Sequence, residues 1–163
     1  MSRHLAKIKE IIEEHQTIRG SVKLVGDSVS DQEALNSLRS MRSDWSPGRL
    51  ELLSEKQNKL QQTVSLLDEG LENHFAREEE VLPSVLGDFL MRALLLEHEE
   101  IRKAISKARL MAGGNRLEGL TQEELKSRDL EIQQVVSSLS QLIEAHADKE
   151  DMMLEMVKRA LPA

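Results

Sequence analysis

Four histidines and two glutamates of this 163-residue chain stand where the surrounding apolar pattern predicts leucine or isoleucine. They are His15, His74, Glu78, His98, His146 and Glu150. Each glutamate follows a histidine by four residues, and side chains at i and i+4 project from one face of an α-helix. Imidazole and carboxylate are the ligands that suit iron, manganese and zinc. The residue types and their spacing therefore indicate a metal site.

Burial of these groups also favours a cation. An uncompensated charge in a protein core costs several kcal/mol. No lysine or arginine lies on the same apolar stripes near Glu78 or Glu150, so a pair of divalent metal ions is the partner that fits them. A lone buried histidine is more often an ordinary core residue than a ligand, but that reading has to explain six polar core positions at once.

The elements that must position these residues are amphipathic helices. Apolar residues recur at intervals of three and four, a spacing typical of helices with one buried face. The four stretches run over residues 5–25, 53–85, 94–112 and 139–157.

Local signals mark the ends of these helices. Ser46-Pro47 and the Thr121–Glu124 capping box are typical of helix starts. Gly87 suits the left-handed residue after a helix, and Asp88 can cap the next one. Pro83 falls inside the second stretch, where we expect it to kink the helix without ending it.

These elements predict one all-α domain over residues 1–163, an antiparallel up-down-up-down four-helix bundle. An extra short helix, Asp31 to about Arg42, is expected between the first and second long helices. It should pack where the second and fourth helices extend beyond the other two, with Trp45 nearby. Position 76, between His74 and Glu78, lies eleven residues before Gly87, and His98 lies eleven residues after it. At about 1.5 Å per residue, the metal-binding positions should therefore be level.

Composition excludes several classes of protein. Aromatic residues make up 2%, without tyrosine, which disfavours a β-sandwich and a stacking surface for single-stranded nucleic acid. Cysteine is absent, so there is no thiolate nucleophile and no Cys-bound zinc. A net charge of −7 disfavours nucleic acid, and no apolar run is long enough for a membrane span. We expect a cytoplasmic protein.

The order of these residues resembles the H…HxxxE…H…HxxxE pattern of hemerythrin-like (HHE cation-binding) domains. The matching segments are Glu14-His15-Gln16, His74-Phe-Ala-Arg-Glu78, Leu96-Glu97-His98-Glu99 and His146-Ala-Asp-Lys-Glu150. The likeness extends from about Met1 to Val157. A single HxxxE is weak, whereas four ligand positions in order, one per helix, are specific.

The resemblance implies a non-haem di-iron centre, oxo- or hydroxo-bridged. It implies that His15 and His74 bind one iron, that His98 and His146 bind the other, and that Glu78 and Glu150 bridge both; manganese or zinc could replace iron. Oxygen-carrying hemerythrins place another histidine four residues after the one in the third helix, but here that position is Arg102. The resemblance therefore does not extend to oxygen storage. Arg102 is expected to pair with an acid such as Glu99.

Three functions remain open. A di-iron protein could bind, sense or reduce a small diatomic or peroxidic ligand (O₂, NO or peroxide) or handle iron. A metal-stabilised interaction or regulatory module would have no redox activity of its own, and a metal-free bundle would bind no ion. No hydrolase triad or nucleotide fingerprint is present, and enzyme activity is left open. Without cysteine, turnover would need an external reductant, and a protein partner is unidentified.

The remaining polar and sulfur-containing side chains are interpreted as structural. His4 is too close to the chain end to be a ligand. Glutamates beside the histidines are predicted to face solvent, with one of them contacting a ligand at most, so Glu79→Ala should have little effect. These are Glu79, Glu80, Glu97, Glu99 and Glu100. The seven methionines, including Met152, Met153 and Met156, are predicted to fill the core.

Overall fold

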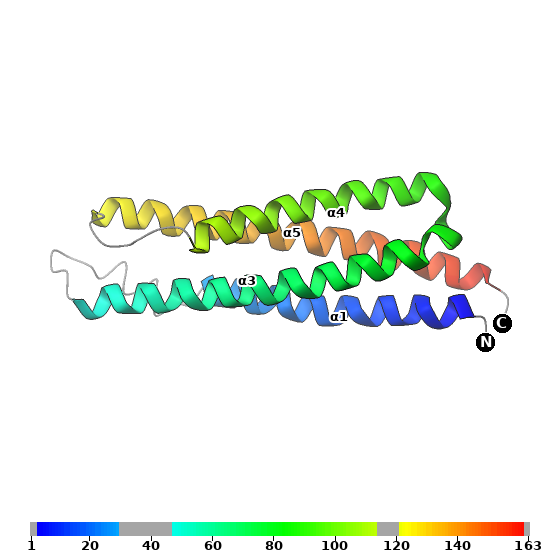
Figure 1. Ribbon diagram of the computed structural model, residues 1–163, viewed down its shortest axis with the longest axis horizontal. Helices are drawn as coiled ribbons and strands as arrows, with labels where there is room; N and C mark the ends of the chain where they lie inside the picture. The colour runs from blue at the N-terminus through cyan, green and yellow to red at the C-terminus, as the bar shows by residue number, and fades with distance from the viewer. Residues whose placement is uncertain (1–2, 30–46, 114–120, 162–163) are drawn as a thin grey trace.

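The computed structural model describes residues 3–29, 47–113 and 121–161, and these residues are almost entirely helical (Figure 1). The four helices are α1 (Arg3–Val29), α3 (Pro47–Val81), α4 (Pro83–Gly113) and α5 (Gln122–Ala160). The described part of the chain contains no strand. The predicted all-α class is confirmed. The predicted helix from Asp31 to Arg42 and Trp45 lie outside the described residues.

The four helices pack as a bundle in which each one contacts two neighbours. The packed pairs are α1 with α3, α3 with α4, α4 with α5, and α5 with α1. The beginning of α1 and the end of α5 lie at the same end of the bundle (Figure 1). Because each helix packs against two neighbours, a side chain on the inner face of any helix points toward a space shared by all four.

Along the described helices, no segment is both long and apolar enough to cross a membrane.

Two of the predicted local signals are confirmed in the described residues, and one expectation is wrong. Thr121 accepts a hydrogen bond from the Glu124 amide, and the Glu124 side chain accepts one from the Thr121 amide, as a capping box requires. Gly87 has a φ of 75°, which is the left-handed conformation predicted for it. The expectation that the second helix continues through Pro83 is wrong, because α3 ends at Val81. Proline has no amide hydrogen and its ring opposes the preceding turn, so a single turn follows before the chain reverses at Gly87.

Two apolar clusters form the core on either side of the polar positions. The larger one includes Val64, Leu67 and Ile105, and the smaller one includes Ile8, Leu82 and Leu154. Met153 packs against the smaller cluster, but Met152 and Met156 are 70% and 66% exposed. The prediction that these two methionines fill the core is therefore wrong, because they face outward on α5.

Candidate metal centre

The six predicted ligand side chains meet in the interior of the bundle, between the two apolar clusters. Every one of them is at most 4% exposed. The set comprises His15 from α1, His74 and Glu78 from α3, His98 from α4, and His146 and Glu150 from α5. The prediction that these groups are level and face inward is confirmed. The end of α3 at Val81 does not disturb the site, because Glu78 lies before it.

The ligand atoms form two groups that share both glutamates. One group is His15, His74, Glu78 and Glu150, and the other is Glu78, His98, His146 and Glu150; within each group the ligand atoms lie within 4.8 Å of one another. Glu78 spans the two groups with its two oxygens. Its Oε1 lies 3.4 Å from His15 Nε2 and also contacts His74 Nε2, while its Oε2 lies 3.0 Å from His98 Nε2. On the other side, Glu150 Oε2 lies 3.2 Å from His146 Nε2 and 3.8 Å from His15 Nε2.

The inward atoms are poorly satisfied by the protein itself. Nε2 of His74, His98 and His146 lacks a hydrogen-bond partner, as does Glu78 Oε2. Both carboxylate oxygens of Glu150 are also without one. Buried polar atoms almost always have partners, and leaving one unpaired costs about 1–3 kcal/mol. Three nitrogens and three oxygens that converge without partners fit a cation that accepts their lone pairs, so the donor set suits a pair of metal ions.

The two shared carboxylates respond differently to their surroundings. Burial acts to raise the pKa of Glu78, but the neighbouring imidazole groups of His15, His74 and His98 hold that pKa well below its ordinary value. Burial and the nearby charge of Glu78 raise the pKa of Glu150, and the neighbouring His146 ring only partly opposes them. Two negative charges this close are costly without a cation, so one carboxylate is held ionised while the other favours its proton.

A supporting carboxylate holds the outer nitrogen of each histidine. His15 Nδ1 lies 2.5 Å from Asp151, His74 Nδ1 lies 2.7 Å from Glu14, His98 Nδ1 lies 3.0 Å from Glu79, and His146 Nδ1 lies 2.6 Å from Glu97. An ionised carboxylate only accepts hydrogen bonds, so each ring donates from Nδ1. The lone pair of a neutral ring is then on Nε2, aimed at the centre. Ligand histidines in metalloproteins are oriented in this way.

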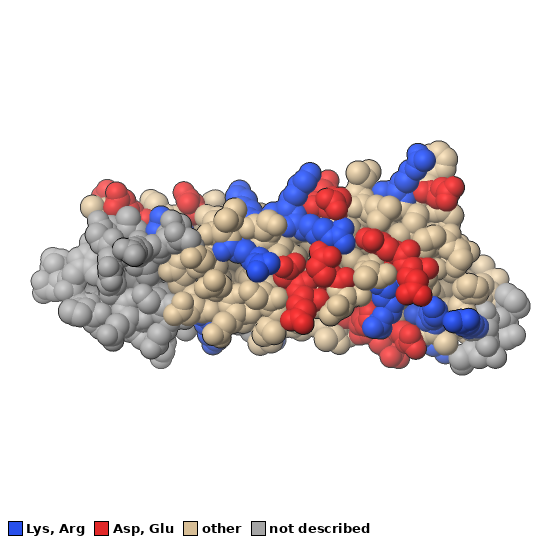
Figure 2. All heavy atoms as spheres, in the orientation of Figure 1, with Lys and Arg blue, Asp and Glu red and all other residues tan. Residues whose placement is uncertain are grey.

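A basic side chain pairs with each supporting carboxylate, and the arrangement repeats around the bundle. The cation always lies three or four residues after the histidine on the same helix, whereas the carboxylate comes from a neighbouring helix. The pairs are Arg19 with Asp151, Arg77 with Glu14, Arg102 with Glu79, and Lys149 with Glu97. Each of the four helix contacts thus contains one such unit. On the face drawn in Figure 2, acidic and basic side chains lie next to one another along the middle of the molecule.

These contacts correct part of the sequence interpretation. Glu79 and Glu97 were predicted to face solvent, but both accept hydrogen bonds from ligand histidines. Glu79→Ala is therefore no longer expected to be silent. Glu14 was noted only as part of the segment around His15, and neither Glu14 nor Asp151 was given a role. A basic residue three or four positions after each of the four histidines was a signal in the sequence that could have revealed the outer contacts.

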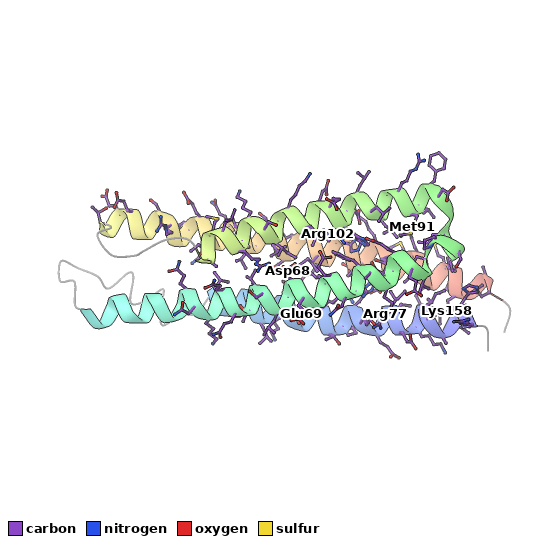
Figure 3. The ribbon with its side chains drawn as sticks, viewed as in Figure 1. Asp68, Glu69, Arg77, Met91, Arg102 and Lys158 are labelled. Carbon is purple, nitrogen blue, oxygen red and sulfur yellow. The ribbon has the colours of Figure 1, made fainter. Side chains whose placement is uncertain are left out.

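Two further side chains distinguish the α4 side of the centre. Phe75 is fully buried and stacks on His98, with ring centroids 3.9 Å apart and planes inclined by 15°. The Arg102 guanidinium lies 5.3 Å from the centre of the Phe75 ring and donates two hydrogen bonds to Glu72. It also lies 3.1 Å from Glu99, which confirms the predicted pairing. Figure 3 labels Arg102 in the space between α3 and α4.

Comparison with known proteins agrees with this architecture. The family model described as the hemerythrin HHE cation-binding domain matches residues 6–157. No curated protein and no solved structure shows significant similarity to the chain. The match covers all six inward residues and all four described helices in large part. The chain therefore belongs to the hemerythrin HHE cation-binding family.

Proposed function

We propose that this protein binds two iron ions in its core and uses them to bind, sense or reduce a small ligand such as O₂, NO or peroxide, or to handle iron. The observation that carries the proposal is the set of converging buried atoms without hydrogen-bond partners, supplied by three histidines and two glutamates. The antiparallel order of the four helices belongs to the same proposal, and the cyclic pattern of helix contacts supports it. Manganese or zinc could occupy the same donor set.

Each residue has a defined role in this proposal. His15 and His74 would hold one ion, and His98 and His146 would hold the other. Glu78 and Glu150 would be shared, because each belongs to both groups of ligand atoms. A pair of iron ions supplies redox capacity and open coordination positions for an external ligand. The supporting carboxylates keep Nδ1 protonated and so keep the Nε2 lone pairs pointing inward.

The surrounding protein restricts what this centre can do on its own. Two apolar clusters close the bundle above and below the six ligands and keep bulk water away from them. The chain has neither tyrosine nor cysteine, so it supplies no tyrosyl radical and no thiol as an internal electron donor. Any reduction of a ligand would therefore need an external reductant. A cytoplasmic location is also part of the proposal.

Anaerobic purification followed by metal analysis and optical spectroscopy tests this function. We expect two irons per chain and a spectrum that changes when air, nitric oxide or peroxide is added. Redox-inert zinc in both positions, with a spectrum that ignores these ligands, would favour the metal-stabilised interaction module instead. A protein that carries no metal after anaerobic purification would exclude both functions.

A further inference from the structure

A small pocket opens between α1 and α3, next to one edge of the candidate metal centre. Its volume is about 190 Å³. His74 lines it, together with the Glu14 and Arg77 pair. Its floor includes the buried apolar side chains of Ile18 and Leu67. The pocket therefore connects the protein surface with the imidazole ring of a ligand residue.

The opposite side of the centre is closed. His98 is covered by the stacked ring of Phe75, and Arg102 lies over that ring and is held by Glu72. Figure 3 labels Arg77 on α3 beside α1, and Arg102 between α3 and α4, so the two arginines mark the two sides. Of these two sides, the one between α1 and α3 is therefore the more open.

We propose that this pocket is a vestibule through which small uncharged molecules reach the metal centre, an inference that rests on the proposed function. A cavity of about 10–15 Å³ is enough to hold one water molecule. A pocket of about 190 Å³ therefore has room for several diatomic molecules. Its apolar floor favours uncharged solutes over hydrated ions. Arg77 does not attract anions strongly, because Glu14 already balances its charge.

Gly70 offers a position at which a larger side chain can narrow the vestibule. It lines the pocket, and a Cβ atom added to it would meet no atom within 4 Å. A leucine at this position in α3 would therefore begin without a clash at its Cβ atom. Gly20 offers a matched control, because it is exposed in α1, does not line the pocket, and likewise has nothing within 4 Å of an added Cβ.

Stopped-flow binding of nitric oxide to the iron-loaded protein tests the path. For Gly70→Leu we expect the association and dissociation rates to fall by the same factor, at least about fivefold, with an unchanged Kd. A blocked path slows both directions equally, whereas a damaged binding site changes the Kd. Gly20→Leu should behave like the wild-type protein. Unchanged rates in Gly70→Leu would overturn the vestibule.

A second measurement does not depend on iron chemistry. In the zinc-loaded protein, dissolved O₂ should broaden the methyl NMR signals of Ile18 and Leu67 by paramagnetic relaxation. Gly70→Leu should remove most of that broadening, and Gly20→Leu should retain it. Absence of nitric oxide binding by the di-iron wild-type protein would contradict the proposed function, not the vestibule. Equal broadening of these methyl signals in all three proteins would contradict the vestibule.

Discussion

The two halves of the candidate metal centre have similar ligands but different surroundings. His15 and His74 lie edge to face with centroids 4.8 Å apart, and His98 and His146 do the same at 5.0 Å. Every ring is held by a supporting carboxylate. Only the second half has an aromatic ring stacked on a ligand, among the residues that the structure describes, and the first half borders a pocket. The ligand pattern is thus repeated, while Phe75 covers one half and a pocket borders the other.

Phe75 creates this difference from a position next to a ligand. It follows His74 by one residue, so on the α3 helix it points about 100° away and reaches toward α4 and α5. Its ring contacts His98 and lies 6.0 Å from His146. One side chain thus packs against both histidines of the second half. The following variants test how far the two halves depend on shared and separate supports.

The largest effect is expected from a change that affects both halves. Glu78→Ala removes the carboxylate whose two oxygens face the two groups of ligands. We expect the metal content to fall from two ions per chain to almost none, together with a lower thermal stability. Glu80→Ala is the control, because Glu80 is exposed two residues further along the same helix. Equal metal content in the two variants, measured by elemental analysis, would reject the shared role of Glu78.

Removing the stacked ring should weaken the second half first. Phe75→Ala leaves a cavity beside His98, and such a truncation in a core costs about 3–5 kcal/mol of unfolding free energy. Phe89→Ala should cost very little, since Phe89 is 89% exposed. Urea denaturation of both variants in the zinc-loaded form measures the difference. A cost below about 1 kcal/mol for Phe75→Ala would show that the stack contributes little.

Removing one supporting carboxylate should weaken metal binding in one half of the centre only. Glu97→Ala frees the His146 ring and Glu14→Ala frees the His74 ring. Loss of such an outer contact typically reduces metal affinity by about 10–100-fold. Glu97→Gln should recover part of the loss, because its amide oxygen still accepts from Nδ1. Competition with a chelator gives the affinities, and Glu100→Ala is the exposed control. An unchanged metal affinity in Glu97→Ala would contradict the supporting role of Glu97.

The smallest expected effect concerns pH. As the pH rises, the stability of the metal-free protein should fall while metal binding should strengthen. Burial acts to lower the pKa of His146, but the nearby carboxylate of Glu150 and the hydrogen bond with Glu97 raise it. Its contribution to the stability of the metal-free protein is therefore complete below the unfolded value of about 6.5 and is lost as the pH rises through the folded value. Metal binding requires neutral imidazole and should strengthen over the same range.

Chemical denaturation between pH 5.5 and 8.5, with and without zinc, measures both slopes. The metal-free protein should lose stability toward high pH, and the zinc-loaded protein should gain it. Parallel curves would show that His146 titrates independently of metal binding. Full metal retention at pH 4 would count against imidazole ligation in either half.

The sequence predicted the inner part of this site better than the outer part. A histidine in an otherwise apolar stripe is a strong local signal, since helical periodicity alone determines that it faces inward. Glu14, Glu79, Glu97 and Asp151 stand on polar faces where most glutamates and aspartates contact solvent. Their roles depend on how a neighbouring helix is rotated, which periodicity within one helix does not reveal.

The course of the backbone was likewise predicted only where it depends on single residues. Gly87 was predicted because its left-handed conformation is a property of one residue. The end of α3 at Val81 was not, because a proline can either kink a helix or end it, depending on the packing around it. Likewise, the stacking of Phe75 on His98 depends on how α3 and α4 pack together, which the pattern within one helix does not reveal.

Anomalous diffraction from crystals of the anaerobically purified protein, recorded at the iron absorption edge, would locate the iron ions in the bundle. We expect two iron peaks in each chain, one between His15 and His74 and the other between His98 and His146. Glu78 and Glu150 should contact both. A single peak, or iron bound elsewhere while these six side chains remain free of metal, would contradict it.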